Sequence, residues 1–103
     1  MTAPDSVTRR VPDGHEVART TPTWTRATVP AALLADHHTT VWAELVVEVG
    51  EVRFYEVDGP DAPWEAIATP DAGVVIVANR KHRIEPSADA RFHVVFYAEP
   101  SPG

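Results

Sequence analysis

The stretch WAELVVEVGEVRFYEV, residues 42–57, decides the fold class. In its first half, apolar side chains such as Leu45 and Val47 alternate with a face that carries Glu44 and Glu48. A period of two places alternate side chains on opposite faces of a β-strand. The second half alternates in the same way after a glycine, so the stretch predicts two strands joined as an antiparallel hairpin.

The rest of the chain continues this pattern of short strands between turns. Valine and isoleucine together number 18, against four for leucine and methionine, and β-branched side chains favour strands. The ten prolines interrupt the chain too often for long helices. We predict further strands at 65–69, 74–78, 82–86 and 91–98, with the continuously apolar run 74–78 buried on both faces, and a short helical turn within 31–36. The prediction is an all-β fold, a small antiparallel sandwich or barrel.

A chain of 103 residues fits one domain with one core. Residues 1–21 have no sustained apolar period, so we expect a flexible N-terminal tail there. The β-domain is expected over residues 22–98, and residues 99–103 are expected to form a C-terminal tail.

The charge and the composition exclude several classes of function. The net charge is −6, and residues 27–78 carry nine acidic side chains and one basic one, a field that repels nucleic acid. The longest apolar run has five residues, against roughly 20 for a membrane-spanning helix, so we expect no membrane insertion. No cysteine is present, which excludes thiolate metal sites and disulfides and agrees with a cytoplasmic location.

The candidate functional residues are histidines, of which the chain has five. His37 and His38 precede the first strong strand, His82 begins a later one, and His93 lies within the last one. Histidines that converge at one end of a β-domain form a metal site, whereas a single histidine is more often solvated or hydrogen-bonded. No nucleophile elbow or phosphate loop occurs, so we predict no catalytic residue.

Motifs spread over residues 21–98 resemble the TehB/YeaR-like cupin domain family, a group of small bacterial cupins related to tellurite resistance. The motifs are Thr21-Pro22-x-Trp24, Thr28-x-Pro30, Leu33-Leu34-x-x-His37-x-Thr39, then Trp42, Leu45, Val47, Gly50 and Phe54-Tyr55, followed by Val75-Ile76-Val77, His82-x-Ile84-Glu85-Pro86 and Phe92-x-Val94-x-Phe96-Tyr97. Each motif is weak alone, and the order and spacing carry the resemblance.

The resemblance implies a cupin, a double-stranded β-helix of two facing sheets with a divalent metal at the open end. His37 matches the histidine of the first motif and His82 that of the second. Glu44 resembles the carboxylate ligand, and His93 is a further candidate ligand. The metal would be Zn, Ni, Mn or Fe. His37 and His38 are adjacent, so only one of them can face the interior of a regular strand.

Three functions follow as hypotheses. The first is a metal-capable module that binds a small molecule or an oxyanion in a stress-related or tellurite-resistance role, with Trp42, Phe54 and Phe96 as apolar pocket walls. The second is a metal-dependent cupin enzyme of the oxygenase, isomerase or detoxification type. The third is a structural or regulatory domain that assembles as a homodimer. The basic residues Arg80, Lys81 and Arg83 either attract an anion toward the site or cover the end of a strand.

Overall fold

The computed structural model describes residues 9–100, which form eight strands and one short 3-10 helix. The strands are β1 (Glu16–Thr20), β2 (Trp24–Thr25), β3 (Ala43–Val49), β4 (Val52–Glu56), β5 (Trp64–Ala68), β6 (Val74–Ile76), β7 (His82–Pro86) and β8 (Arg91–Ala98), and the helix η1 spans Ala31–Leu34. No helix among these residues is long and apolar enough to cross a membrane.

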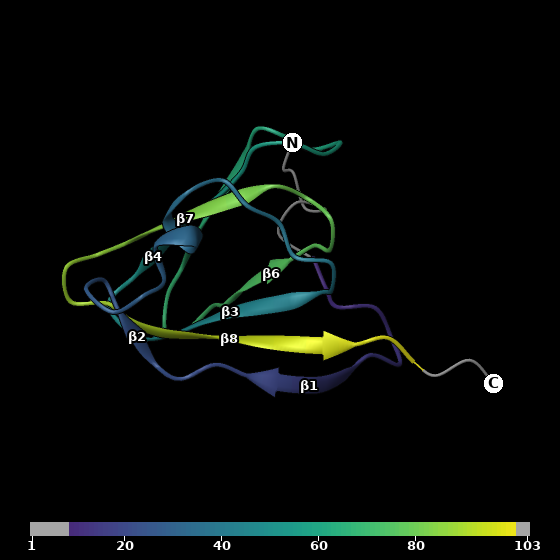
Figure 1. Ribbon diagram of the computed structural model, residues 1–103, viewed down its shortest axis with the longest axis horizontal. Coiled ribbons are helices and arrows are strands. Elements are labelled where there is room, and N and C mark those ends of the chain that lie inside the picture. Colours follow the sequence, from purple (N-terminus) through teal and green to yellow (C-terminus); the bar gives the residue numbers. More distant parts are fainter. Residues whose placement is uncertain (1–8, 101–103) are drawn as a thin grey trace.

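The strands form two antiparallel sheets (Figure 1). The larger sheet has the order β1-β8-β3-β6, and β2 also pairs with β8. The smaller sheet has the order β5-β4-β7. The all-β sandwich predicted from the sequence is therefore confirmed. The described strands do not close into a barrel, because the two sheets keep separate edges.

The predicted hairpin of residues 42–57 is wrong, because β3 and β4 belong to different sheets. Val49 at the end of β3 pairs with Arg91 of β8, whereas Val52 at the start of β4 pairs with Ala68 of β5. Alternation shows that each strand buries one face, but it does not identify the strand's partner. Both strands point their apolar faces at the other sheet, which is the arrangement of a sandwich.

Gly50 makes the crossing between the sheets possible. Its φ of 75° lies in the left-handed region that favours glycine. A Cβ at this position would lie 2.7 Å from a carboxylate oxygen of Asp89 and 3.0 Å from the Cα of Ala90. The turn therefore requires glycine for its backbone conformation and for its close contact with the segment before β8.

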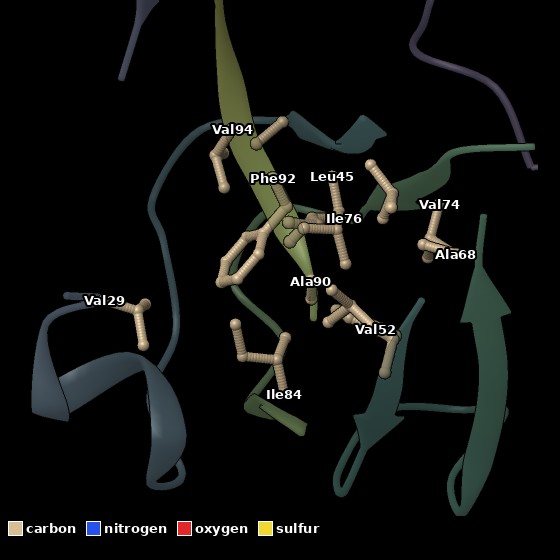
Figure 2. Close-up of a cluster of buried hydrophobic side chains, with 13 residues drawn as sticks. Val29, Leu45, Val52, Ala68, Val74, Ile76, Ile84, Ala90, Phe92 and Val94 are labelled. Carbon is tan, nitrogen blue, oxygen red and sulfur yellow. The ribbon is translucent and has the colours of Figure 1, made fainter. Parts of the chain in front are cut away.

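The core lies between the two sheets and holds thirteen apolar residues (Figure 2). They are Val29, Ala43, Leu45, Val47, Val52, Phe54, Ala68, Val74, Ile76, Ile84, Ala90, Phe92 and Val94. The ring of Trp24 packs edge-on against that of Phe92, with centroids 6.2 Å apart. Both halves of the stretch 42–57 thus contribute their apolar faces to one core.

Two edge strands differ from the sequence prediction. Residues 16–20, expected in the flexible tail, form β1, whose side chains are all exposed and whose backbone pairs with β8. Backbone hydrogen bonds to β8 therefore hold β1 in place. Such bonds do not require an apolar pattern, so the sequence does not reveal this strand. The run 74–78 forms the three-residue strand β6 at the other edge, where Val75 is only half-buried instead of buried.

Candidate functional site

A cavity of about 260 Å³ opens at the inner side of the larger sheet. Strands β1, β2, β3, β6, β7 and β8 contribute side chains to its lining, and most of the lining residues are apolar. The lining residues are Arg19, Thr21, Pro22, Trp24, Leu33, His37, Thr39, Leu45, Ile76, His82, Ile84, Val94 and Phe96. A concave, mostly apolar site with few polar groups is the usual form of a small-molecule site.

The structure brings His37 and His82 together in this cavity, as the resemblance implied. The backbone N–H of His37 donates to the carbonyl of His82 at 2.9 Å, and the N–H of His82 donates to the carbonyl of His37 at 2.7 Å. The ring centroids are 4.5 Å apart, and the rings meet edge-on at 67°. An isolated antiparallel bridge thus fixes both imidazoles beside each other. The adjacent His38 does not line this cavity and lies in a groove with Tyr97.

Hydrogen bonds define the tautomer of both rings. Nδ1 of His82 lies 3.0 Å from the carbonyl oxygen of Arg80, and Nδ1 of His37 lies 3.2 Å from that of Ala35. A carbonyl can only accept, so each Nδ1 carries a proton, and in the neutral form of each ring Nε2 keeps the free lone pair. Within residues 9–100 neither Nε2 has a hydrogen-bond partner. Histidines that ligate metals are held in the same way.

The surroundings of His82 keep its ring neutral. The residue is 2% exposed, and its ring stacks on Phe54 with the centroids 5.2 Å apart. Burial, followed by repulsion from a protonated His37, lowers the pKa of His82 from the usual 6.5 to about 4. The carbonyl of Arg80 and the carboxylate of Glu56 oppose this shift without reversing it. At neutral pH the His82 side chain is therefore an uncharged imidazole.

The other two predicted metal ligands, Glu44 and His93, lie on the outer face of the larger sheet, away from the cavity. The hydroxyl of Tyr97 donates to Glu44 at 3.2 Å. Nδ1 of His93 lies 2.8 Å from Glu48, which also accepts a hydrogen bond from Thr23. The bond from Thr23, followed by that from His93, lowers the pKa of Glu48. Each of these groups has a partner in the outer face.

The predicted pocket residues divide in three ways. Phe96 lines the cavity. Phe54 is fully buried and supports the ring of His82 instead of forming a wall. Trp42 does not line the cavity and directly precedes the buried first residue of β3, Ala43.

Two of the three basic side chains around His82 form ion pairs, and the third residue is bound to an acidic group through its backbone. Arg80 contacts Glu56 at 3.1 Å, and Arg83 contacts Asp36 at 3.3 Å. The backbone N–H of Lys81 donates to Asp58 at 2.6 Å. We considered that these residues either attract an anion or cover the end of a strand. The contacts fit the second hypothesis.

A buried carboxylate, which the sequence analysis had not singled out, lies on the strand beside His82. Glu56 pairs with His82 across β4 and β7 and is 1% exposed. Arg9 binds both of its oxygens, at 2.7 and 3.1 Å, and Arg80 binds one of them. The guanidinium of Arg9 also lies 3.6 Å from the ring centroid of Trp64. Two arginines thus neutralise the only acidic side chain that the described part of the core buries.

The cavity also has a charged lining residue that the sequence analysis missed. Arg19 belongs to β1, opposite Phe96 of β8, and its guanidinium lies 4.6 Å from the Phe96 ring centroid. Nothing in the sequence around Arg19 indicated a site, because β1 has no apolar pattern.

The donor set allows an open metal site. No group of three or more His, Asp or Glu side chains within residues 9–100 is arranged to hold a metal ion. His37 and His82 are the predicted ligands that lie side by side, so a metal in this cavity would have two imidazole ligands and its remaining positions open to water or a ligand.

Comparisons with known proteins agree with this architecture. A protein from E. coli (strain K12) is similar in structure, with a TM-score of 0.81 over 91% of this chain and 100% of its own, at 23% identity. TehB from Haemophilus influenzae has a TM-score of 0.75 and 27% identity over 84% of this chain. The match spans only 32% of that TehB chain. A comparison with curated proteins found no match. The family model of the TehB-like domain matches residues 19–94, so the chain belongs to the TehB-like domain family.

Proposed function

We propose that this domain is a metal-capable binding module for a small molecule, with the inner cavity as its site. The observation that carries the proposal is the pair His37 and His82, whose Nδ1 protons are bound to carbonyls and whose Nε2 lone pairs remain free beside an apolar cavity. The arrangement of facing sheets with histidines at one end is also the reason to propose a fold of the cupin type.

The proposed metal is Zn, Ni, Mn or Fe, held by the Nε2 atoms of His37 and His82. Imidazole is a suitable ligand for Zn, Fe and Ni, and a metal with open positions would act as a Lewis acid toward a bound ligand. Phe54 keeps the His82 ring in place from behind, and the carbonyl of Arg80 holds its tautomer. These two contacts fix the direction of the His82 Nε2 lone pair in the absence of a metal.

A metal-dependent enzyme is the second candidate function. The observation in its favour is that two imidazoles, and no third ligand-type side chain within residues 9–100, lie together here, which would leave coordination positions for a substrate. A role in stress or tellurite resistance, in the cytoplasm, is proposed from membership of the TehB-like family. We rank the binding module first, because binding requires only the cavity and its metal ligands, whereas an enzyme would also require catalytic groups.

Metal analysis of protein purified without a histidine tag tests the proposal. We expect about one metal per chain, and Zn, Ni, Mn or Fe at a hundredfold excess over Kd should stabilise the fold by ~2.7 kcal/mol. His37→Gln and His82→Gln should each remove the bound metal and the thermal shift, because each removes one of two protein ligands. His93→Gln is the matched control and should retain both.

Two results would contradict this proposal. One is a wild-type protein that is free of metal and whose melting temperature does not respond to any of the four ions. The other is a loss of metal in His93→Gln that equals the loss in His82→Gln. A circular dichroism spectrum of each variant separates loss of metal from loss of fold.

A further inference from the structure

The charge of the inner cavity is opposite to that of the whole chain. The chain carries 15 acidic and 9 basic side chains. No acidic residue lines the cavity, and its only permanently charged lining residue is Arg19. The cavity is therefore positively charged at Arg19, although the net charge of the chain is −6. An apolar site with one cation favours an anion with an apolar body.

Arg19 has no carboxylate partner within residues 9–100. By contrast, Arg9, Arg80 and Arg83 each contact at least one acidic side chain. The Arg19 guanidinium lies over the face of the Phe96 ring, which restricts the position of the guanidinium. The N–H groups of Arg19 remain available to bind a ligand. Arg19 is exposed and His82 is buried, so the cation lies at the solvent side of the cavity.

The remaining polar groups of the lining are already used. The hydroxyls of Thr21 and Thr39 donate to the carbonyls of Pro22 and Val41, at 3.0 and 2.8 Å. The Nδ1 protons of both histidines are bound to carbonyls as well, so Arg19 is the strong donor left for a ligand. A planar guanidinium binds a carboxylate through two parallel hydrogen bonds.

We propose that the cavity binds a small organic carboxylate, with its charge on Arg19 and its apolar body against Trp24, Leu33 and Phe96. This inference rests on the proposed function and names the class of ligand. A compact oxyanion fits less well. It would lose its hydration shell in the cavity, and apart from Arg19 the mostly apolar lining would not replace the lost hydrogen bonds.

Titrations monitored by protein NMR test this inference, with benzoate, its neutral analogue benzamide, and tellurite as probes. The protein is kept metal-free with EDTA, so that a metal does not bind the carboxylate. We expect benzoate to shift the resonances of Trp24 and Leu33 and to bind at least about tenfold more tightly than benzamide or tellurite. Arg19→Gln should weaken benzoate binding about tenfold and leave benzamide binding unchanged, whereas Arg19→Lys should keep part of the difference.

Arg53→Gln is the matched control, because it removes the same charge from an exposed position on β4 outside the cavity. It should leave benzoate binding unchanged. Equal binding of benzoate and benzamide, or tighter binding of tellurite, would overturn the carboxylate inference while the metal proposal stands. Benzoate binding that depends on Arg19 in a protein without metal affinity would support the inference and contradict the metal proposal. No shift with any probe would overturn the inference.

Discussion

Glu56→Gln is expected to lower the free energy of unfolding by about 3 kcal/mol, as is typical when one partner of a buried ion pair is removed. The variant leaves Arg9 and Arg80 facing a neutral amide in place of the buried carboxylate, with the exposed Asp61 as their remaining acidic partner. For a domain of this size the melting temperature should fall by at least ~12 °C. Urea unfolding followed by tryptophan fluorescence measures the loss.

Two controls separate the ion pair from general effects of substitution. Glu65→Gln changes an exposed carboxylate on the neighbouring strand and should cost less than about 0.5 kcal/mol. The triple variant Arg9→Met, Glu56→Leu, Arg80→Met should recover most of the lost stability, because it leaves no unpaired buried charge. The explanation fails if Glu56→Gln costs no more than Glu65→Gln.

The second large effect is a dependence of stability on pH that arises from His82. The unfolded chain binds a proton at this residue below its usual pKa of 6.5, whereas the folded protein does so only near its pKa of about 4. The stabilisation is therefore complete above pH 6.5 and is lost as the pH falls toward 4. The integrated loss is about 3 kcal/mol.

Urea unfolding of metal-free protein between pH 7.5 and 4 measures this dependence. His82→Gln should have a shallower loss of stability across the window, by about 3 kcal/mol, because its side chain does not titrate. His38→Gln is the control and should stay close to the wild type, since His38 lies outside the cavity and is the smallest of the influences on the pKa of His82. Equal slopes for all three proteins would show that His82 is not held neutral by burial.

Local patterns in the sequence predicted most of the strands. The last strand has the bounds that alternation indicated, because Phe92 and Val94 point inward and His93 points outward. Alternation could also have identified the buried Glu56, which shares a face with Val52 and Phe54. The pairing of β3 and β4 with other strands could not be predicted in this way, because the partners are chosen by contacts between distant segments.

The candidate site was predictable only in part. Spacing does not bring His37 and His82 together, since 45 positions separate them, and it was the family resemblance that named both. Arg19 and Arg9 lie where the sequence predicted a tail. Their roles depend on a strand with no apolar face and on an ion pair across 47 positions, and neither leaves a local signal.

The most direct test of the central claim is a long-range ¹H–¹⁵N NMR spectrum of the histidine rings, recorded before and after addition of Zn²⁺. Metal-free protein at neutral pH should show His82 as the neutral tautomer with its proton on Nδ1. Added Zn²⁺ should shift the Nε2 resonances of His37 and His82 together and leave His93 unchanged. A response of His93 with no change at His37 and His82 would contradict the account, because it would place the metal outside the inner cavity.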